Sequence, residues 1–325
     1  METQDYSSTV MKKANIRIIA IGGGGSNVLN KMLAKDWKDV NCIAANTDMQ
    51  SLERSDANIK ILLGKEIMGG MGAGSNPVIG RKAALESRYE IRAILKGAEM
   101  VIILTCLGGG TGTGGAPVVA EISKELGATV IAVVSTPFTF EGTRRREESE
   151  LGLATLKEKV DSIIVIHSQR ILIPLGTNAT LLKAFEEIDW LMSLAVGCVA
   201  GVFYPFGLVS ANVGTIKTML LASDIAGLGF GSAAGENRAI TALKNAMTSP
   251  HLAGHTIGSS CVILVGISGP TDLRLSEVYE VIHTIRDLAC VNSHIACTAV
   301  VDEKLGDTVW VTIVIFENLA FLRSL

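Results

Sequence analysis

Short apolar runs and longer stretches with helical spacing alternate along the first half of the chain. The runs are rich in Ile, Val, Leu and Ala, and each is bounded by glycine or polar residues. Because these runs are apolar throughout and alternate with helical patterns, they predict a mostly parallel sheet with helices on both faces, an α/β fold. The predicted strands lie at 15–21, 40–45, 59–63, 100–104, 129–134 and 162–166.

The second half of the chain has a different pattern. Segment 179–203 predicts one long helix, and a mixture of helices and strands follows it. Further helices are predicted near 215–226, 236–247 and 275–289, and strands near 261–267, 294–301 and 308–316. We therefore expect a tail (1–12), a parallel-sheet domain (13–178), a central helix (179–204), an α+β domain (205–318) and a short tail (319–325).

The stretch from Leu191 to Ile216 contains no charged residue, which also fits a membrane span. The part before Tyr204 is shorter than the roughly 20 residues that a spanning helix needs, and Pro205 interrupts the remainder of the stretch. A helix buried on all sides in the core fits better, and we expect no membrane insertion.

Composition narrows the class of protein. With 48% hydrophobic and 19% charged residues, the chain of 325 residues can bury a large core and is not disordered. The net charge of −3 shows none of the excess positive charge that is typical of nucleic-acid-binding proteins. Cysteines without Cys-x-x-Cys spacing and a polar N-terminus favour the cytoplasm. His251 and His255 have metal-ligand spacing, but no acid or thiol stands near them in sequence, so we expect no metal held by protein side chains.

Two glycine-rich loops each follow a predicted strand and precede a helical pattern. They span 22–27 and 108–114, and a helix is expected near Ala116-Pro117, with proline in its first turn. Backbone N–H groups at such a junction bind anions, and the hydroxyls of Thr111 and Thr113 add donors. One such loop alone could be a flexible turn, whereas two in one α/β domain favour a polyphosphate ligand. The lysine of a Walker-type loop is absent from both.

Further motifs occur in a definite order. Asn46-Thr-Asp48 follows a strand, Gly72-Ala-Gly-Ser-Asn-Pro77 and Pro137-Phe-Thr-Phe-Glu-Gly-Thr-Arg-Arg145 come later in the first half, and 235–239 and 301–307 lie in the second half. Together with the glycine-rich loops, this series resembles the FtsZ/tubulin family, more closely FtsZ, over roughly residues 13–317. The resemblance implies a Rossmann-like GTP-binding domain, a long central helix and an α+β C-terminal domain. It also implies GTP or GDP with Mg²⁺ as ligands, and head-to-tail filaments in cell division or shape control. The expected partners are copies of the chain itself and another FtsZ, and the expected location is the cytoplasm, at the division site.

The resemblance assigns a nucleotide site residue by residue. Phe185 and Asp189 lie one helical turn apart, where the ring would stack on guanine and the carboxylate would accept from donors that adenine lacks. Glu141 would contact the ribose and Arg145 the phosphates. The remaining implied contacts are Gly22, Gly23, Gly24, Gly25, Ser26, Asn27, Asn46, Gly72, Ala73, Gly74, Gly108, Gly109, Gly110, Thr111, Gly112, Thr113 and Gly114.

The chain departs from the family in the loop that completes a neighbouring subunit's site. By resemblance, the three polar functional positions of the family's loop, Asn-x-Asp-Phe-Ala-Asp, fall on Ser210, Asn212 and Thr215, and a two-residue gap would instead align Asn212 with the family's asparagine. Neither register supplies an acid, because no Asp or Glu lies between Asp189 and Asp224. Hydroxyls and amides activate water poorly, so slow hydrolysis is expected. The alternatives are a fully active GTPase that uses another acid such as Asp224, or a copolymerising regulator of another FtsZ.

Three smaller departures concern single positions and the end of the chain. Cys106 replaces a usual glycine, and it either crowds the phosphate loop or fills space beneath it. Val78 replaces a usual glutamate. The sequence ends at Leu325, so the family's C-terminal docking peptide is expected to be absent.

Overall fold

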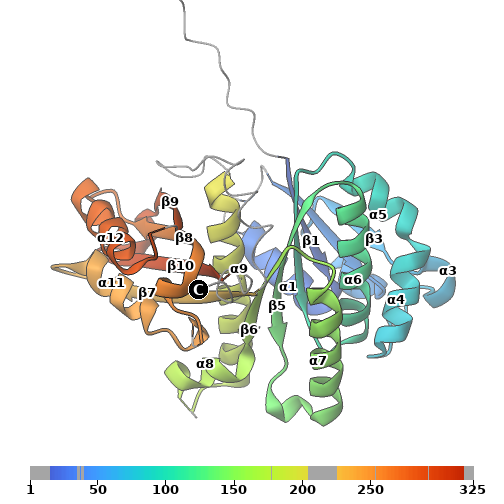
Figure 1. Cartoon of the computed structure of the whole chain (residues 1–325). Helices are drawn as coiled ribbons and strands as arrows, with labels where there is room; N and C mark the ends of the chain where they lie inside the picture. Colours follow the sequence, from blue (N-terminus) through green and yellow to red (C-terminus); the bar gives the residue numbers. More distant parts are fainter. Residues whose placement is uncertain are drawn as a thin grey trace, which may run out of the picture.

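A computed structural model describes residues 15–34, 37, 40–176, 178–203, 225–252, 254–291 and 293–317. Ten strands form one sheet in the order β3-β2-β1-β4-β5-β6-β7-β10-β8-β9 (Figure 1). The strands are β1 (Ile16–Ile21), β2 (Asn41–Asn46), β3 (Ile59–Leu62), β4 (Met100–Cys106), β5 (Thr129–Thr136), β6 (Ser162–His167), β7 (Ile225–Ala233), β8 (Ser260–Gly269), β9 (His294–Val301) and β10 (Val309–Glu317). The longer helices are α1 (Gly22–Leu33), α4 (Pro77–Glu86), α5 (Arg88–Leu95), α6 (Gly110–Glu125), α7 (Thr143–Lys157), α8 (Ser168–Leu175), α9 (Leu181–Phe203), α11 (Arg238–Met247) and α12 (Leu275–Leu288), with short α2 (Met49–Glu53) and α3 (Lys65–Met68).

The parallel half of the sheet confirms the predicted α/β class. Each of the six predicted strands is present, with ends that differ by at most about two residues. β1 pairs with β2 on one side and with β4 on the other, so the strand order reverses between β1 and β4. In open parallel sheets, ligand loops gather at the carboxyl ends of the strands beside such a reversal.

Helices cover both faces of this half. Side chains of α1, α8 and α9 share one buried cluster with alternate residues of the strands, while α4, α5, α6 and α7 share a second cluster with the other residues. This two-sided burial explains why the strands are apolar throughout rather than alternating.

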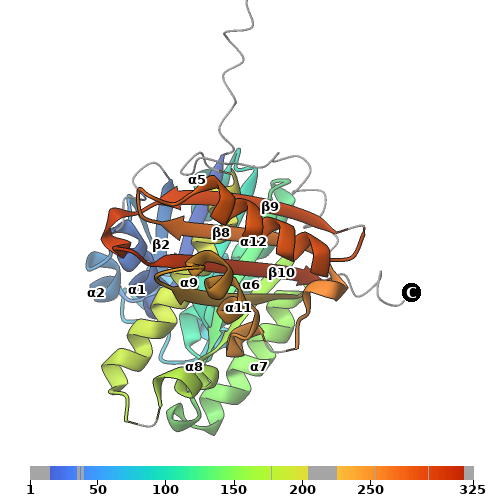
Figure 2. The same cartoon turned by 90° about the vertical axis from the view of Figure 1, so that its left-hand side faces the viewer.

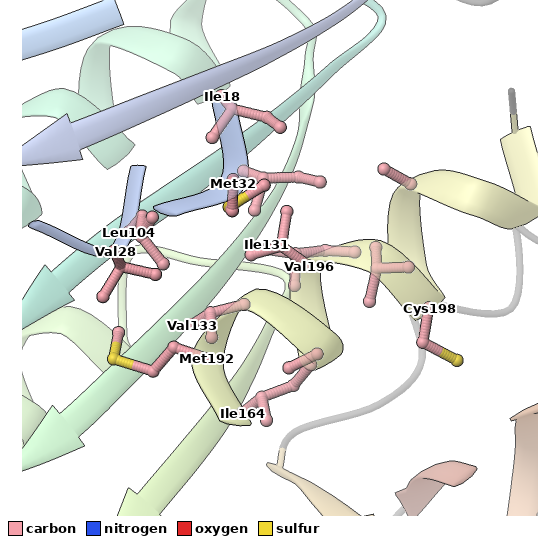
Figure 3. Close-up of a cluster of buried hydrophobic side chains, with 14 of the residues drawn as sticks. Ile18, Val28, Met32, Leu104, Ile131, Val133, Ile164, Met192, Val196 and Cys198 are labelled. Carbon is pink, nitrogen blue, oxygen red and sulfur yellow. The ribbon is translucent and has the colours of Figure 1, made fainter. Parts of the chain in front are cut away.

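The predicted central helix is confirmed as α9. Met192 and Val196 lie among Ile131, Val133 and Ile164 of the parallel strands (Figure 3). The same cluster contains residues of the C-terminal strands, so α9 is packed from both halves of the sheet (Figure 1). Burial on all sides accounts for its uncharged second half. Within the described residues, no helix is both long and apolar enough to cross a membrane.

An aromatic cluster ties α9 to the C-terminal strands. The ring of Trp190 lies edge-on to Phe230 of β7, with centroids 4.5 Å apart, and to Trp310 of β10 at 5.7 Å. Phe230 and Trp310 are themselves 5.6 Å apart and nearly perpendicular. We call Trp190, Phe230 and Trp310 the Trp190 cluster.

The expected helix near 215–226 is wrong at its end. Residues 215–224 lie outside the described residues, but 225–226 begin β7, a strand that the sequence did not predict. A Cβ on Gly229 would come within 2.4 Å of the Ala246 carbonyl oxygen, and one on Gly231 within 2.1 Å of the Ala242 carbonyl oxygen. Glycines therefore let α11 approach β7 closely, and their low strand propensity hid the strand.

The predicted start of the helix after the second glycine-rich loop is also wrong. α6 begins at Gly110, inside that loop, and Pro117 lies in the helix interior rather than in its first turn. The loop's own backbone supplies the first helical turn. The predicted elements after residue 233 are confirmed, with α11 and α12 packed on one face of β8 and β10 (Figure 2).

Candidate functional site

Three of the predicted loops meet at the carboxyl edge of the parallel strands. The hydroxyls of Thr47 and Thr111 are 2.6 Å apart and share a hydrogen bond. A Cβ on Gly110 would lie 2.9 Å from the Ala73 Cβ and 2.7 Å from the Asn76 nitrogen. The loops after β2, after α3 and after β4 are therefore in direct contact.

The glycines of these loops serve two physical purposes. Gly22 and Gly108 have φ of +77° and +93°, which side-chain-bearing residues rarely adopt. Gly25 and Gly112 instead allow close packing, since their Cβ atoms would lie 2.4 Å from the Leu104 carbonyl oxygen and 2.3 Å from the Thr105 hydroxyl. Gly109 has open space around it, so it is a position where a ligand could approach the backbone.

Polar side chains brace the loops from inside. The Thr113 hydroxyl accepts a hydrogen bond from the Gly108 N–H at 2.8 Å, and the Ser26 hydroxyl donates to the Gly22 carbonyl at 3.0 Å. The Asn46 amide oxygen accepts from the Asp48 N–H at 3.3 Å. All three side chains are buried, so they hold the loop backbone in place.

A cavity of about 240 Å³ opens between these loops and α9. Its lining includes six of the predicted site residues, Cys106, and Pro137 of the motif 137–145. Five further lining residues were missed by the sequence analysis, although Ser135, Thr136 and Ser168 stand at the carboxyl ends of β5 and β6, a signal that could have found them. We call this the Asp189 cavity; it is lined by Gly24, Asn27, Cys106, Leu107, Ser135, Thr136, Pro137, Glu141, Arg145, Ser168, Phe185, Ile188 and Asp189.

Phe185 presents an aromatic surface at one end of the cavity. The residue is 39% exposed, and its ring lies edge-on to the fully buried Phe138, with centroids 5.5 Å apart. Phe138 stacks in turn on Phe140 at 4.9 Å. This packing fixes the ring of Phe185 while leaving part of it open to a planar ligand.

Asp189 places a carboxylate one helical turn after Phe185. Its side chain is 16% exposed, and Oδ2 lies 3.3 Å from the Lys31 ammonium nitrogen. Burial raises the pKa of Asp189 above its usual value, and the charge of Lys31 opposes that shift. The site therefore holds a half-buried acceptor whose ionisation depends on a neighbouring cation.

Glu141 and Arg145, four residues apart in the sequence, form an ion pair. Arg145 Nε lies 3.2 Å from Glu141 Oε2, and Glu141 Oε1 accepts from the Phe138 N–H at 2.8 Å. Arg145 is half exposed, so its guanidinium remains accessible to an anion in the cavity.

Comparison with known proteins identifies the family to which this chain belongs. The family described as Tubulin/FtsZ family, GTPase domain, matches residues 15–173, and the FtsZ family, C-terminal domain, matches residues 224–317. The cell division protein FtsZ of Coxiella burnetii is 38% identical over 311 residues, which cover 96% of this chain and 81% of that protein. This chain belongs to the FtsZ/tubulin family. The predicted resemblance is confirmed.

Solved structures agree with the assignment. An empty FtsZ dimer from M. jannaschii matches the FtsZ-family chain with a TM-score of 0.90 and 37% identity, covering 95% of this chain and 90% of that one. The GDP-bound monomer of CetZ1 from Haloferax volcanii has a TM-score of 0.75 and 20% identity, covering 93% of each chain, and so shares the fold.

Two positions where this FtsZ-family chain departs from the expected motifs are now located. A Cβ built on Gly24 would come within 2.5 Å of the Cys106 sulfur, which places Cys106 against the first glycine-rich loop, in the cavity wall. Burial raises the pKa of its thiol to about 11, so the group is neutral at pH 7. Val78 is exposed at the start of α4, where its N–H donates to the Asn76 side chain.

Two further predictions fall elsewhere in this FtsZ-family chain. Ser210, Asn212 and Thr215 lie outside the described residues. No acid stands near the histidine pair in the sequence, but the fold brings Glu317 of β10 to 3.3 Å from the His255 ring. Within the ranges that the structure describes, no three His, Cys, Asp or Glu side chains gather as a metal site.

Proposed function

We propose that the chain binds GTP in the Asp189 cavity and over the adjoining glycine-rich loops. The observation that carries this proposal is the pairing, in one cavity, of the Phe185 ring with the Asp189 carboxylate. A carboxylate accepts from N1–H and the 2-amino group of guanine, and adenine offers neither donor in that arrangement. Glu141 then contacts the ribose and Arg145 the phosphates, with the rest of the triphosphate over 108–114 and 72–74. Mg²⁺ binds with the nucleotide through phosphate oxygens.

Calorimetry with GTP and ATP tests base recognition. Asp189→Ala should weaken GTP binding by about 1–3 kcal/mol, the cost of a lost hydrogen bond to a charged group, and leave ATP binding unchanged. Glu187→Ala is the matched control, because Glu187 lies on the same helix, pairs with Lys183 at 3.8 Å and does not line the cavity. Equal affinity of the wild-type protein for GTP and ATP would refute the proposal.

We also propose that copies of the chain assemble head to tail into filaments in the cytoplasm, at the division site, and that another FtsZ is a second partner. The support is the family assignment, the relative named as a cell division protein and the FtsZ structure described as a dimer. A head-to-tail interface does not close on itself and so extends into a filament. Light scattering should rise after GTP is added and not after ATP.

Slow hydrolysis is the third part of the proposal. Its support is the absence of any Asp or Glu between Asp189 and Asp224, which leaves the non-acidic residues Ser210, Asn212 and Thr215 at the three polar positions of the family's loop. Phosphate release should stay low as assembly proceeds, and the double variant Asn212→Asp/Thr215→Asp should raise it. Wild-type turnover that climbs with protein concentration to about 1 per second or faster would refute this part. Its loss in Asp224→Asn would then identify Asp224 as the acid.

A further inference from the structure

We propose that Lys31 is a positioning residue for base recognition, holding the Asp189 carboxylate from behind the cavity without touching the base. This inference rests on the proposed function, because it concerns how the same site selects guanine. Its evidence is a contact between two helices that are far apart in the sequence.

The ammonium group of Lys31 bridges two acceptors on α9. Its nitrogen lies 3.3 Å from Asp189 Oδ2 and 3.3 Å from the Glu186 carbonyl oxygen. The contact with the Glu186 carbonyl oxygen holds the ammonium group against the backbone of α9. The ion pair between Lys31 and Asp189 therefore has a defined geometry. The Asp189 side chain is only 16% exposed, which strengthens the attraction relative to a surface pair.

Lys31 approaches Asp189 from outside the Asp189 cavity. It lines a separate hollow of about 480 Å³, formed with Ala34, Lys183, Glu186, Glu187, Trp190, Ser193 and Trp310. That hollow and the Asp189 cavity have no lining residue in common. A base in the cavity can therefore meet the carboxylate while Lys31 keeps its contact.

The chemistry of guanine recognition requires this carboxylate to be ionised. A protonated acid would lose acceptor capacity toward the two guanine donors. Burial and the nearby charge of Glu186 both raise the pKa of Asp189, and Lys31 lowers it. The other charged or titratable groups around the cavity are the neutral Cys106 and the mutually paired Glu141 and Arg145.

Helix α1 also connects the contact between Lys31 and Asp189 to the first glycine-rich loop. The helix begins at Gly22 in the first glycine-rich loop, and Lys31 lies in its last turn. One rigid helix thereby fixes the distance between the loop proposed for the phosphates and the acceptor proposed for the base.

The test compares GTP and ATP affinity, by calorimetry between about pH 5 and pH 8, in the wild type, Lys31→Met, Lys31→Arg and Lys183→Met. Lys183 is the matched control, since it lines the same hollow and pairs with Glu187 instead. Lys31→Met should weaken GTP binding about five- to tenfold near pH 8, with a larger loss at lower pH and no change for ATP. Lys31→Arg should restore both affinity and pH profile, and Lys183→Met should match the wild type.

Each other outcome has a defined meaning. Unchanged GTP affinity and pH profile in Lys31→Met would overturn the inference and leave the proposed function intact. Equal losses for GTP and ATP, in a variant with wild-type circular dichroism and urea midpoint, would also overturn it, since the effect would not be specific to the base. A wild-type protein that does not prefer GTP would refute the proposed function itself.

Discussion

Alanine substitutions at two glycines of one loop should affect different properties, Gly112→Ala the stability of the fold and Gly109→Ala the affinity for GTP. A Cβ on Gly112 would lie 2.3 Å from the Thr105 hydroxyl and 2.9 Å from the Cys106 carbonyl oxygen, both at the end of β4. Such overpacking costs about 1–3 kcal/mol. The displaced Thr105 hydroxyl also donates to the Ile21 carbonyl at 2.9 Å, and losing that bond adds about 1 kcal/mol. We expect Gly112→Ala to reduce the free energy of unfolding by about 2–4 kcal/mol.

Gly109 offers the contrast. No atom lies within 4 Å of its built Cβ, and its φ of −94° and ψ of 169° suit any residue. Gly109→Ala should change the free energy of unfolding by less than about 1 kcal/mol, since a weaker helix cap is offset by a less flexible unfolded chain. Its Cβ would project into the space proposed for a phosphate, so GTP affinity should fall about tenfold.

Urea denaturation followed by circular dichroism measures the first effect, and calorimetry with GTP measures the second. Gly258→Ala serves as the control, because Gly258 is exposed and its built Cβ comes no closer than 3.6 Å to another atom. A wild-type urea midpoint for Gly112→Ala would show that the close packing is not real. Full GTP affinity in Gly109→Ala would show that the phosphates do not approach this backbone.

Three further predictions concern pH, an ion-pair cluster and the base site. Burial lowers the pKa of His251 to about 4, below its unfolded value of about 6.5, so stability is full above pH 6.5 and is lost as pH falls toward 4. His251→Gln should remove about 2 kcal/mol of the stability difference between pH 7 and pH 5, measured by urea denaturation at each pH. Arg238 is buried and contacts Glu277 at 2.9 Å, so Arg238→Met should destabilise by about 3–5 kcal/mol, and adding Glu277→Leu should recover part of the loss. Phe185→Leu should weaken GTP and ATP binding alike, since stacking does not distinguish bases, whereas Asp189→Ala affects GTP alone; a GTP-only loss in Phe185→Leu would contradict the stacking role.

The sequence predicted the parallel half of the sheet because its physical signal is local. Strands such as β1 and β4 are apolar at nearly every position, and turn residues bound them, so their ends follow from composition alone. The positions of the ligand loops then follow from topology, since the carboxyl ends of parallel strands share one edge. The long uncharged stretch of α9 was predictable for the same reason.

Features that depend on contact between distant segments could not be predicted. The glycines of β7 leave room for α11, which packs directly against them. In the sequence alone, the same glycines indicate that the segment is not a strand. Leu107 and Ile188 are apolar and buried like ordinary core residues, and only the folded structure shows that they line the Asp189 cavity. The pair of Lys31 and Asp189 joins two helices that no spacing rule connects.

The Trp190 cluster provides an intrinsic fluorescence signal. Trp190 directly follows Asp189, so any rotation of α9 that accompanies ligand contact at Asp189 also turns the indole against Phe230 and Trp310. Two of the chain's three tryptophans belong to this cluster. Their fluorescence should therefore respond to any movement between the two halves of the sheet, and it can be measured in solution without an attached dye.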